Sequence, residues 1–293
     1  MAGLPRLPKG NFMCSKKIKS EKLKGAEGFE SYYNDLYGER WSVLKEALLS
    51  EKDDFAWQYN DSLPKYYLDK GSVFAALSLP LQDAQNILDL CAAPGGKTLV
   101  LASLMENEAI LHCNERSFER TIRLKKVIAE HLPQEINQRI VVTCSDGAKM
   151  CLSKQNYYDR ILLDAPCSSE RHVLTSSKHL SLWSPARIKT LAVSQWALLS
   201  SAYRMLKPQG YILYSTCALS SVENDQIVYK LIKKFKDVVI VKELKEINSK
   251  ACSFFKGTLP KYEHTEYGFH ILPDLAEGAG PLYFCLIQKN CQF

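Results

Sequence analysis

The sequence predicts an α/β fold, in which a small helical extension precedes a doubly wound, mainly parallel sheet. Three observations support this prediction. From Ile87 onward, short apolar runs of strand type alternate with segments of helical periodicity. A Pro-Gly-Gly turn joins the first of these strands to a helix, and polar residues follow most of the strands. With 293 residues and 46% hydrophobic content, the chain can bury the core that such a sheet needs.

The region before the sheet contains three kinds of segment. Residues 1–25 are rich in Pro and Lys and have little to bury, so we expect a flexible basic tail. Phe29 to Leu49 carries apolar residues at helical spacing, Asp53 to Leu68 mixes aromatic with polar residues, and Ser72 to Leu79 predicts another helix. Residues 26–80 are therefore expected to form a helical and aromatic extension, and residues 81–293 the main domain.

The elements of the main domain follow from hydrophobic periodicity. Strands are expected over Ile87–Leu90, Ala109–Cys113, Arg139–Cys144, Asp159–Leu163, Gly210–Ser215, Val238–Val241 and Pro281–Ile287. Helices are expected over Lys97–Met105, Phe118–Leu132 and Ala186–Leu206. The expected buried positions of the second helix are Ile122, Val127, Ile128 and Leu132. Ser220 and Glu223 have capping-box spacing and predict the start of a further helix, whereas Ile247 to Glu266 predicts a loop.

The stretch from Leu88 to Thr98 predicts a small-molecule site. A strand, a glycine turn and a helix in succession expose backbone N–H groups and a helix N-terminus to a ligand. A P-loop would need a glycine five residues before its Gly-Lys, and Cys91 occupies that position. The dinucleotide pattern G-x-G-x-x-G is also absent, so the turn alone is equally compatible with a plain strand-to-helix connection.

Acidic residues follow three of the predicted strands. The carboxyl ends of parallel strands meet at one rim of a sheet, so Glu115, Asp146 and Asp164 are expected there together. Glu115 is placed to accept hydrogen bonds from ribose hydroxyls, and Asp146 to accept one from an adenine amino group. These two acids predict a pocket for a ligand that contains adenosine and needs no phosphate site. S-adenosylmethionine is such a ligand. Its positively charged sulfonium would be attracted by acids near the pocket.

Two cysteines also follow predicted strands, and together they indicate covalent catalysis. Cys167 comes after Asp164, and Cys217 follows the strand that ends at Ser215. Carbon-5 of a pyrimidine becomes nucleophilic only after a thiolate has added to carbon-6. Because a free thiol has a pKa of about 8.5, the attacking cysteine needs a nearby cation or a helix N-terminus. The helix predicted to begin at Ser220 would supply that N-terminus for Cys217.

These motifs resemble the Nop/Sun-type RNA cytosine-5 methyltransferases, which use S-adenosylmethionine. The matching pieces are Leu88–Thr98, then Asp164-Ala165-Pro166-Cys167-Ser168, then Tyr214-Ser215-Thr216-Cys217. The resemblance implies a Rossmann-like methyltransferase domain over residues 81–293. It implies Cys217 as the nucleophile on carbon-6, Cys167 as the residue that assists proton removal and product release, and Asp164 as a partner of the activated cytosine. The implied cofactor site consists of Cys91, Ala92, Ala93, Pro94, Gly95, Gly96, Lys97, Glu115, Arg120, Asp146 and Asp164.

One segment departs from the pattern of many family members. The residues Ser168-Ser169-Glu170-Arg171-His172 stand where those members have a glycine-containing loop. An acid-Arg pair there is similar to the branch that contains the mitochondrial ribosomal-RNA and tRNA enzymes.

The predicted function is formation of 5-methylcytosine in RNA, with ribosomal RNA favoured over tRNA as substrate. The net charge of +6 is compatible with a nucleic-acid partner. One alternative is a methyltransferase acting on an exocyclic amine or on protein; another is a non-catalytic RNA-binding or ribosome-assembly factor that retains the fold. None of the ten cysteines form a Cys-x-x-Cys pair, so no metal site is expected. Without a signal or membrane segment, a cytoplasmic location is expected, with the mitochondrial matrix as the alternative.

Overall fold

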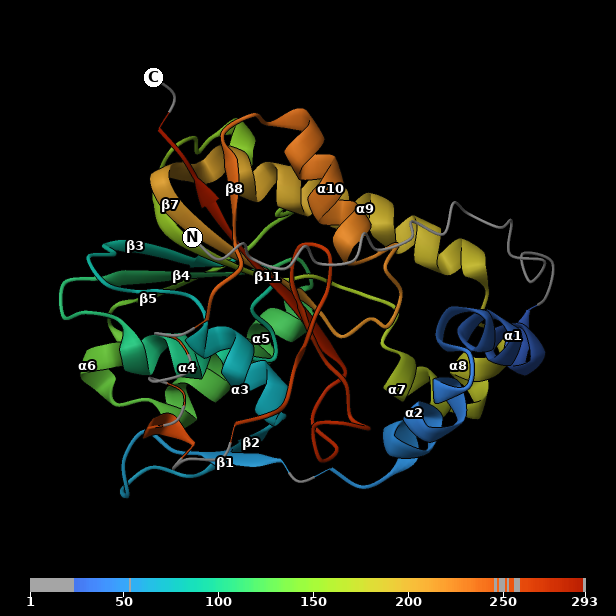
Figure 1. The fold of residues 1–293 in the computed structure, drawn as a ribbon. Coiled ribbons are helices and arrows are strands. Elements are labelled where there is room, and N and C mark those ends of the chain that lie inside the picture. Colours follow the sequence, from blue (N-terminus) through green and yellow to red (C-terminus); the bar gives the residue numbers. More distant parts are fainter. Residues whose placement is uncertain are drawn as a thin grey trace, which may run out of the picture.

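The fold centres on a nine-stranded sheet that is mostly parallel (Figure 1). The computed structural model describes residues 24–52, 54–244, 247, 251, 253–255 and 259–291. The strands of this sheet are β3 (Asn86–Asp89), β4 (Ile110–Glu115), β5 (Ile140–Cys144), β6 (Tyr158–Asp164), β7 (Leu206–Thr216), β8 (Val238–Val241), β9 (Glu263–His264), β10 (Phe269–Ile271) and β11 (Leu282–Lys289). A separate antiparallel hairpin pairs β1 (Phe55–Trp57) with β2 (Tyr66–Leu68).

The strand order places a ligand-binding crevice in the middle of the sheet. The order is β5-β4-β3-β6-β7-β11-β10-β9, and β8 pairs with β11. The five neighbouring strands β5, β4, β3, β6 and β7 are parallel to one another, whereas β11 runs antiparallel to β7. Chain connections therefore run in opposite directions from β3 and from β6, which lie side by side. In such sheets ligands bind outside the carboxyl ends of the strands at this reversal.

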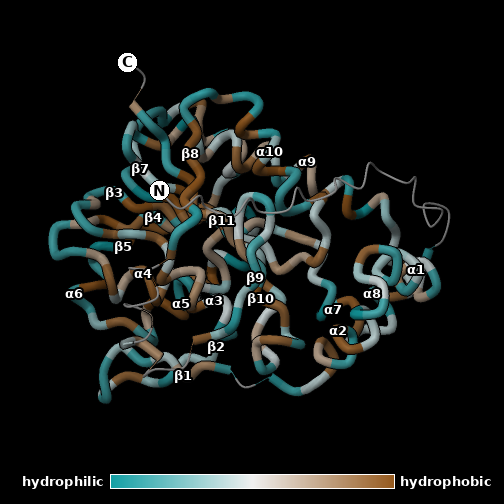
Figure 2. Tube along the Cα trace, in the orientation of Figure 1, coloured by the Kyte–Doolittle hydropathy of each residue, from teal (hydrophilic) through white to brown (hydrophobic). Residues whose placement is uncertain are grey.

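Helices cover both faces of the sheet (Figure 1). On one face lie α3 (Lys70–Leu77), α4 (Gly96–Leu104), α5 (Phe118–His131) and α6 (Gln134–Asn137), and on the other lie α9 (Pro185–Met205) and α10 (Asp225–Lys234). Figure 2 shows hydrophobic residues gathered on the central strands and hydrophilic ones on the outer turns. Ile87 and Leu88 of β3 are fully buried in the cores on opposite faces. A strand covered on both faces is apolar at successive positions, which explains the short continuous run in the sequence.

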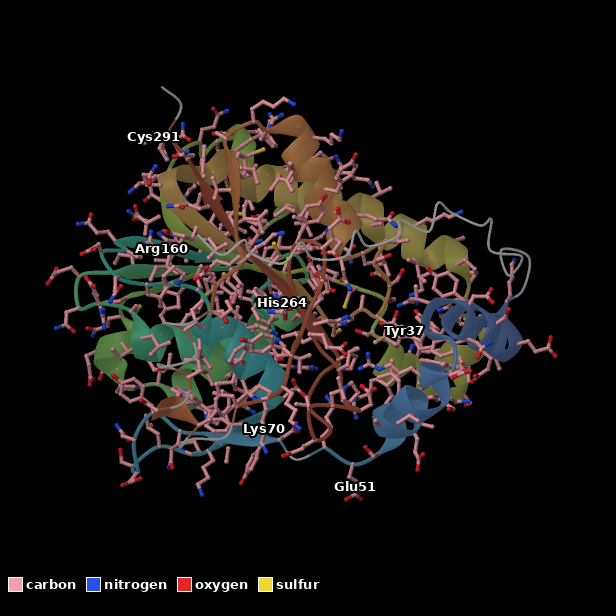
Figure 3. The ribbon with its side chains drawn as sticks, viewed as in Figure 1. Tyr37, Glu51, Lys70, Arg160, His264 and Cys291 are labelled. Carbon is pink, nitrogen blue, oxygen red and sulfur yellow. The ribbon has the colours of Figure 1, made fainter. Side chains whose placement is uncertain are left out.

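A third hydrophobic cluster joins the N-terminal helices to the segment after β6. The helices α1 (Gly25–Tyr37) and α2 (Arg40–Leu49) lie beside α7 (Glu170–Leu174) and α8 (Ser177–Ser181). Phe29 and Tyr33 pack there against Trp183, and Trp41 stacks on Tyr33. The loop that carries Cys167 is thus supported by residues far away in the sequence. Figure 3 shows Tyr37 on this side of the molecule and Arg160, near the start of β6, on the opposite side.

Each strand and helix expected in the main domain has a counterpart, and the differences from expectation in the chain have physical causes. The single helix expected over Phe29–Leu49 is interrupted at Gly38, whose φ of 58° ends α1. Ile122, predicted to be buried, is 55% exposed, because the buried face of α5 is formed by Thr121, Leu124, Ile128 and His131. The short strand β10 has no counterpart among the predicted elements.

The helix predicted at Ser220 begins later, at Asp225. The Glu223 carboxyl accepts hydrogen bonds from the Ser168 main chain and the Gln195 side chain and does not cap a helix at Ser220. The short antiparallel strand β9 lies within the predicted loop Ile247–Glu266, other residues of which are outside the described part, as is the tail up to residue 23. The division into segments 1–25, 26–80 and 81–293 stays a prediction.

Candidate active site

The loop between β3 and α4 forms one wall of the site. The main-chain N–H of Ala92 donates a 2.9 Å hydrogen bond to Asn114 O on β4, which anchors the loop to the sheet. Gly95 precedes α4 with a φ of 122°, a conformation that favours glycine. A Cβ at Gly95 would lie 2.9 Å from a side-chain carbon of Val127, so the loop also packs closely against α5. The predicted glycine turn therefore exists and holds Lys97 at the start of α4.

Lys97 and Asp164 form an ion pair at the sheet reversal. Lys97 Nζ donates a 2.7 Å hydrogen bond to Asp164 Oδ2 and a 3.2 Å bond to Ser72 Oγ. Ser215 donates to the other oxygen of Asp164 at 3.0 Å. Burial disfavours the Lys97 ammonium, but the Asp164 charge and hydrogen bond outweigh it and raise the pKa of Lys97. This pair fixes one carboxylate beside the cavity with both of its oxygens engaged.

The two predicted cysteines meet at this rim. Cys167 follows β6 and Cys217 follows β7, and their Sγ atoms are 2.9 Å apart although the residues are 50 positions apart in sequence. The main-chain N–H of Cys217 also donates to Cys167 Sγ at 3.3 Å. Interaction with Cys167 lowers the pKa of the Cys217 thiol, burial opposes this, and a hydrogen bond with Ser169 lowers it further. The pKa of Cys167 is raised by the same sulfur contact and by burial. The arrangement favours Cys217 as thiolate and Cys167 as thiol.

The prediction that a helix N-terminus at Ser220 favours the Cys217 thiolate is wrong. Because α10 begins at Asp225, its N-terminus lies eight residues beyond Cys217 and not directly after Ser220. The groups that contact the Cys217 sulfur are instead the Cys167 thiol and the Ser169 hydroxyl, the latter at 2.9 Å.

A buried pair of glutamates lies behind the cysteines. The Ser168 hydroxyl contacts a carboxyl oxygen of Glu170 and, at 2.5 Å, Oε2 of Glu223. Tyr33 donates to Glu170 Oε1, and the Leu219 N–H donates to Glu170 Oε2 at 3.1 Å. Burial raises the pKa of both carboxyl groups, that of Glu223 to about 7. This network ties the Cys167 loop to the Cys217 loop through residues adjacent to each.

The predicted acids Glu115 and Asp146 lie at the ends of the neighbouring strands β4 and β5. Glu115 is 4% exposed; its Oε1 accepts from the Ser117 N–H, and its Oε2 accepts no hydrogen bond but lies 3.2 Å from Arg120. Arg120 also donates to the Ala93 carbonyl, so it links Glu115 to the glycine turn. Asp146 is partly buried and accepts from the Ala148 N–H at 3.2 Å.

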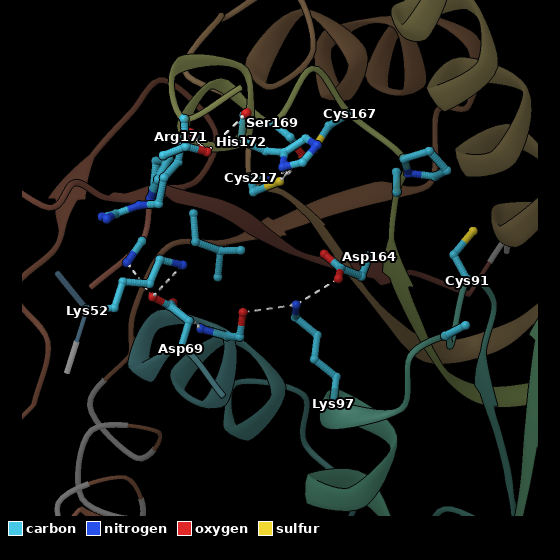
Figure 4. Close-up of a pocket in the computed structure, with 18 of the residues that line it drawn as sticks. Lys52, Asp69, Cys91, Lys97, Asp164, Cys167, Ser169, Arg171, His172 and Cys217 are labelled. Atoms are coloured by element: carbon cyan, nitrogen blue, oxygen red, sulfur yellow. Dashed lines mark hydrogen bonds and ion pairs between the residues drawn. The ribbon is translucent and has the colours of Figure 1, made fainter. Parts of the chain in front are cut away.

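These residues surround a cavity of about 630 Å³ (Figure 4). The predicted residues that line it are Cys91, Ala93, Lys97, Arg120, Asp164, Cys167 and Cys217. An adjoining cavity of about 280 Å³ shares Lys97 and Asp164 and adds Ala92, Pro94 and Gly96. Gly95, Glu115 and Asp146 stand behind these walls. Within the described ranges, no group of three or more His, Cys, Asp or Glu side chains could hold a metal ion.

Several lining residues were not predicted as site residues, among them Lys52, Asp69, Ser169, Arg171, His172 and Thr175. Arg171 and His172 lie in the segment that departs from the common motif, which is the one sequence signal for them. Ser169 lies in the same segment, but its placement against the site depends on a left-handed backbone conformation that the segment does not predict. Separately, no helix in the described part of the chain has both the length and the apolar character needed to cross a bilayer.

Known proteins similar to this chain share one kind of activity in their names. A family model described as "16S rRNA methyltransferase RsmB/F" matches residues 76–272. The chain is 35% identical over 234 residues to the "5-cytosine rRNA methyltransferase NSUN4" of Bos taurus, covering 78% of this chain and 59% of that protein. It is 33% identical over 232 residues to the "tRNA (cytosine(34)-C(5))-methyltransferase, mitochondrial" of Danio rerio, covering 78% and 61%. The chain thus spans about three fifths of the length of these relatives.

A solved structure has the same fold. It is described as a methyltransferase homolog protein from Pyrococcus horikoshii, with a TM-score of 0.64 and 21% sequence identity. The match covers 89% of this chain and 95% of that one. This likeness confirms the predicted Rossmann-like α/β architecture.

Proposed function

Since this chain belongs to the 16S rRNA methyltransferase RsmB/F family, we propose that it transfers a methyl group from S-adenosylmethionine to carbon-5 of cytosine in RNA. The family membership confirms the predicted resemblance. The observation that carries the proposal is the 2.9 Å separation of Cys167 Sγ and Cys217 Sγ beside the Lys97–Asp164 pair. Methylation of an exocyclic amine needs no thiol, so the two sulfurs favour chemistry at a ring carbon.

The first step uses Cys217. Its thiolate adds to carbon-6 of the cytosine, an S–C6 bond forms, and the C5–C6 double bond opens so that carbon-5 becomes nucleophilic. When bound, S-adenosylmethionine would supply an electrophilic methyl group and leave as S-adenosylhomocysteine. After carbon-5 has gained the methyl group its proton must leave, and we assign its acceptance to Cys167 once that thiol has lost its own proton. The electrons of the C5–H bond then restore the C5–C6 double bond, and Cys217 departs with the S–C6 electron pair.

Asp164 is proposed to orient the base. Its carboxylate lines the cavity while Lys97 and Ser215 hold its two oxygens. A carboxylate fixed in this way can accept a hydrogen bond from the cytosine amino group. Its negative charge also lies where the positive sulfonium would be stabilised.

The residues at the rim fit the adenosine part of the cofactor. Glu115 is almost fully buried, and its Oε2 accepts no hydrogen bond but pairs with Arg120 at 3.2 Å; a ribose hydroxyl would bind it in place of that contact. Asp146, at the end of the adjacent strand, is available to the adenine amino group. The glycine turn offers its main chain without side-chain obstruction. The proposed cofactor site thus keeps the residues that the sequence indicates.

Ribosomal RNA is the proposed substrate, as the relative from Bos taurus is named for it. Purified protein with labelled S-adenosylmethionine should transfer label to unmodified ribosomal RNA, and bisulfite sequencing should place it on cytosine. Replacing Cys217 by Ala should abolish transfer, whereas replacing Cys291, which is exposed and outside the cavity, should not. Full activity of the Cys217→Ala protein would contradict the proposal. RNA binding without any transfer would favour the non-catalytic assembly factor instead, and transfer to tRNA alone would reassign the substrate.

We propose a mitochondrial location in place of the cytoplasmic one expected from the lack of a signal or membrane segment. The name of the relative from Danio rerio includes the word mitochondrial. Fractionation of cells with an antibody to this protein would test the assignment.

A further inference from the structure

Ser169 lies against both sulfurs of the site. Its Oγ is 2.9 Å from Cys217 Sγ and 3.7 Å from Cys167 Sγ. The shorter distance is well within the range of a hydrogen bond to sulfur, and the residue lines the same cavity as both cysteines (Figure 4). Ser169 is therefore in contact with the atom that performs the first step of the proposed reaction.

The backbone of Ser169 adopts a conformation that serine rarely takes. Its φ and ψ are 54° and 62°, in the left-handed region, which is unfavourable for a non-glycine residue. The main chain is held there because Ser169 O accepts from the Val173 N–H at 3.0 Å, and its neighbours Ser168 and Glu170 are fixed in the buried network. The fold thus aims the hydroxyl at Cys217 at a local cost in stability.

Among the described residues, the side chains that contact the Cys217 sulfur are Cys167 and Ser169. The next long helix along the chain begins eight residues later. The Lys97 ammonium acts on Cys217 through its charge, but its hydrogen bonds go to Asp164 and Ser72. The Cys167 thiol contacts Cys217, but Cys167 has its own proposed task later in the reaction.

We propose that Ser169 is a catalytic residue whose O–H donates a hydrogen bond to the Cys217 sulfur and so favours the thiolate that attacks carbon-6. This role rests on the proposed function for its meaning in catalysis. The hydroxyl keeps its proton, and no bond to its oxygen forms or breaks. A hydrogen bond to an anion is stronger than one to a neutral thiol, so the donor stabilises the charged form.

The direction of the hydrogen bond makes the proposal testable without substrate. The purified protein is treated with iodoacetamide across a pH series, and alkylation of the Cys217 peptide is followed by mass spectrometry. The alkylation midpoint is the pH at which Cys217 reacts at half its maximal rate. In the Ser169→Ala and Ser169→Gly proteins this midpoint should rise by about one pH unit, so at any pH below the midpoint the thiolate fraction should be roughly tenfold smaller. An unchanged midpoint would overturn the proposal. A midpoint that moves down would also do so, because it would mean that Ser169 accepts from the thiol.

The controls separate this effect from misfolding. Ser169→Gly suits a left-handed backbone, so it should fold at least as stably as the unaltered protein. Thr175→Val removes another hydroxyl of the same cavity, one that bonds only to main-chain carbonyls, and should leave the Cys217 midpoint unchanged. The exposed Cys144 and Cys291 report on reagent and pH in every sample.

The outcome is independent of the methylation assay. A normal Ser169 effect in a protein that never methylates RNA would defeat the proposed function alone. Active methylation with an unchanged Cys217 midpoint in both Ser169 variants would defeat the present proposal alone.

Discussion

Lys97 Nζ lies 2.7 Å from Asp164 Oδ2, and this contact joins the helix after β3 to the end of β6. It spans the point where the chain connections reverse direction. The side chains of Lys97 and Asp164 are 11% and 33% exposed, so the pair is shielded from water more than a surface ion pair is. Removal of one partner leaves the other charge poorly solvated, which has consequences for stability as well as for activity.

Replacing Lys97 by Met should lower the free energy of unfolding by about 2 kcal/mol, because Asp164 would lose its charged partner. Replacing Asp164 by Asn in the Lys97→Met protein should recover part of this loss. Urea denaturation of both single variants and the double variant gives the coupling energy directly, which we expect to be about 1–2 kcal/mol.

The exposed pair Lys126–Glu130 on α5 is the matched control, since its side chains are 71% and 50% exposed. The same cycle there should give a coupling energy of no more than about 0.5 kcal/mol. Equal coupling energies in the two cycles would show that shielding from water does not strengthen the Lys97–Asp164 pair.

Replacing Cys167 by Ala should trap a covalent complex between Cys217 and RNA. Addition to carbon-6 and methylation would still occur, but loss of the carbon-5 proton and release of the base would be slow. The complex should appear as a slower band on a denaturing gel and should be absent from a protein that also lacks Cys217. If the Cys167→Ala protein releases methylated RNA at the normal rate, Cys167 has no part in release.

The shared contact of Ser168 with two carboxyl groups predicts a pH dependence of stability. A hydroxyl has one proton, so a carboxyl group must supply the second hydrogen bond. Glu223 is suited to do so, because its Oε1 accepts two N–H groups and its Oε2 faces Ser168. Its folded pKa of about 7 lies above the ordinary value, so the folded state holds a proton that the unfolded state releases. The free energy of unfolding should therefore fall as pH rises from about 4.5 to 7.

Replacing Glu223 by Gln should reduce this fall by on the order of 1–3 kcal/mol, since the amide mimics the protonated acid at every pH. Asp89, whose pKa burial also raises to about 7, should maintain a remaining slope. In contrast, the Glu170→Gln protein should be destabilised at all pH values, because both Glu170 oxygens accept hydrogen bonds. The amide NH₂ group would face a second donor, either the Leu219 N–H or the Tyr33 hydroxyl. Denaturation in urea at several pH values checks both expectations, and equal behaviour of the two variants would contradict the assignment.

Replacing Gly95 by Ala should destabilise the protein by about 1–3 kcal/mol and weaken cofactor binding. The backbone there has a φ of 122°, and the new Cβ would meet Val127 at 2.9 Å. Gly96→Ala is the matched control, because Gly96 has ordinary helical backbone and its nearest contact, a ring carbon of Tyr66, would lie at 3.1 Å. Thermal denaturation and calorimetry with S-adenosylhomocysteine should show the larger loss for Gly95; an equal loss would mean that the turn conformation is unimportant.

Much of the site could be predicted because it depends on local order along the chain. Apolar runs and helical patterns alternate, and a parallel sheet built from them must bring the residues after its strands to one rim. For this reason Asp164, Cys167 and Cys217 were expected together, and they line one cavity with Lys97. Glu115 and Asp146, expected at the same rim, do not line it. Their roles in the reaction stay predictions that the experiments above address.

Other features could not be predicted because they arise from contacts between distant segments. Ile122 has the helical spacing of a buried residue, but packing of α5 turns a neighbouring face towards the sheet. Glu223 has capping-box spacing, yet Ser168 and Gln195 compete for its carboxyl group. A local sequence motif does not form when its buried polar group makes stronger hydrogen bonds with distant residues.

The succession of the main strands along the chain, the glycine turn and the two strand-end cysteines were thus contained in the sequence, since each depends on neighbouring residues and on the general geometry of parallel sheets. Tertiary structure alone decided which groups contact the Cys217 sulfur. The later start of α10, the left-handed turn at Ser169 and the glutamate pair behind it all result from packing among α1, α7 and the loops after β6 and β7. Such packing sets distances to within a hydrogen bond, and residue spacing along the chain carries no comparable information about it.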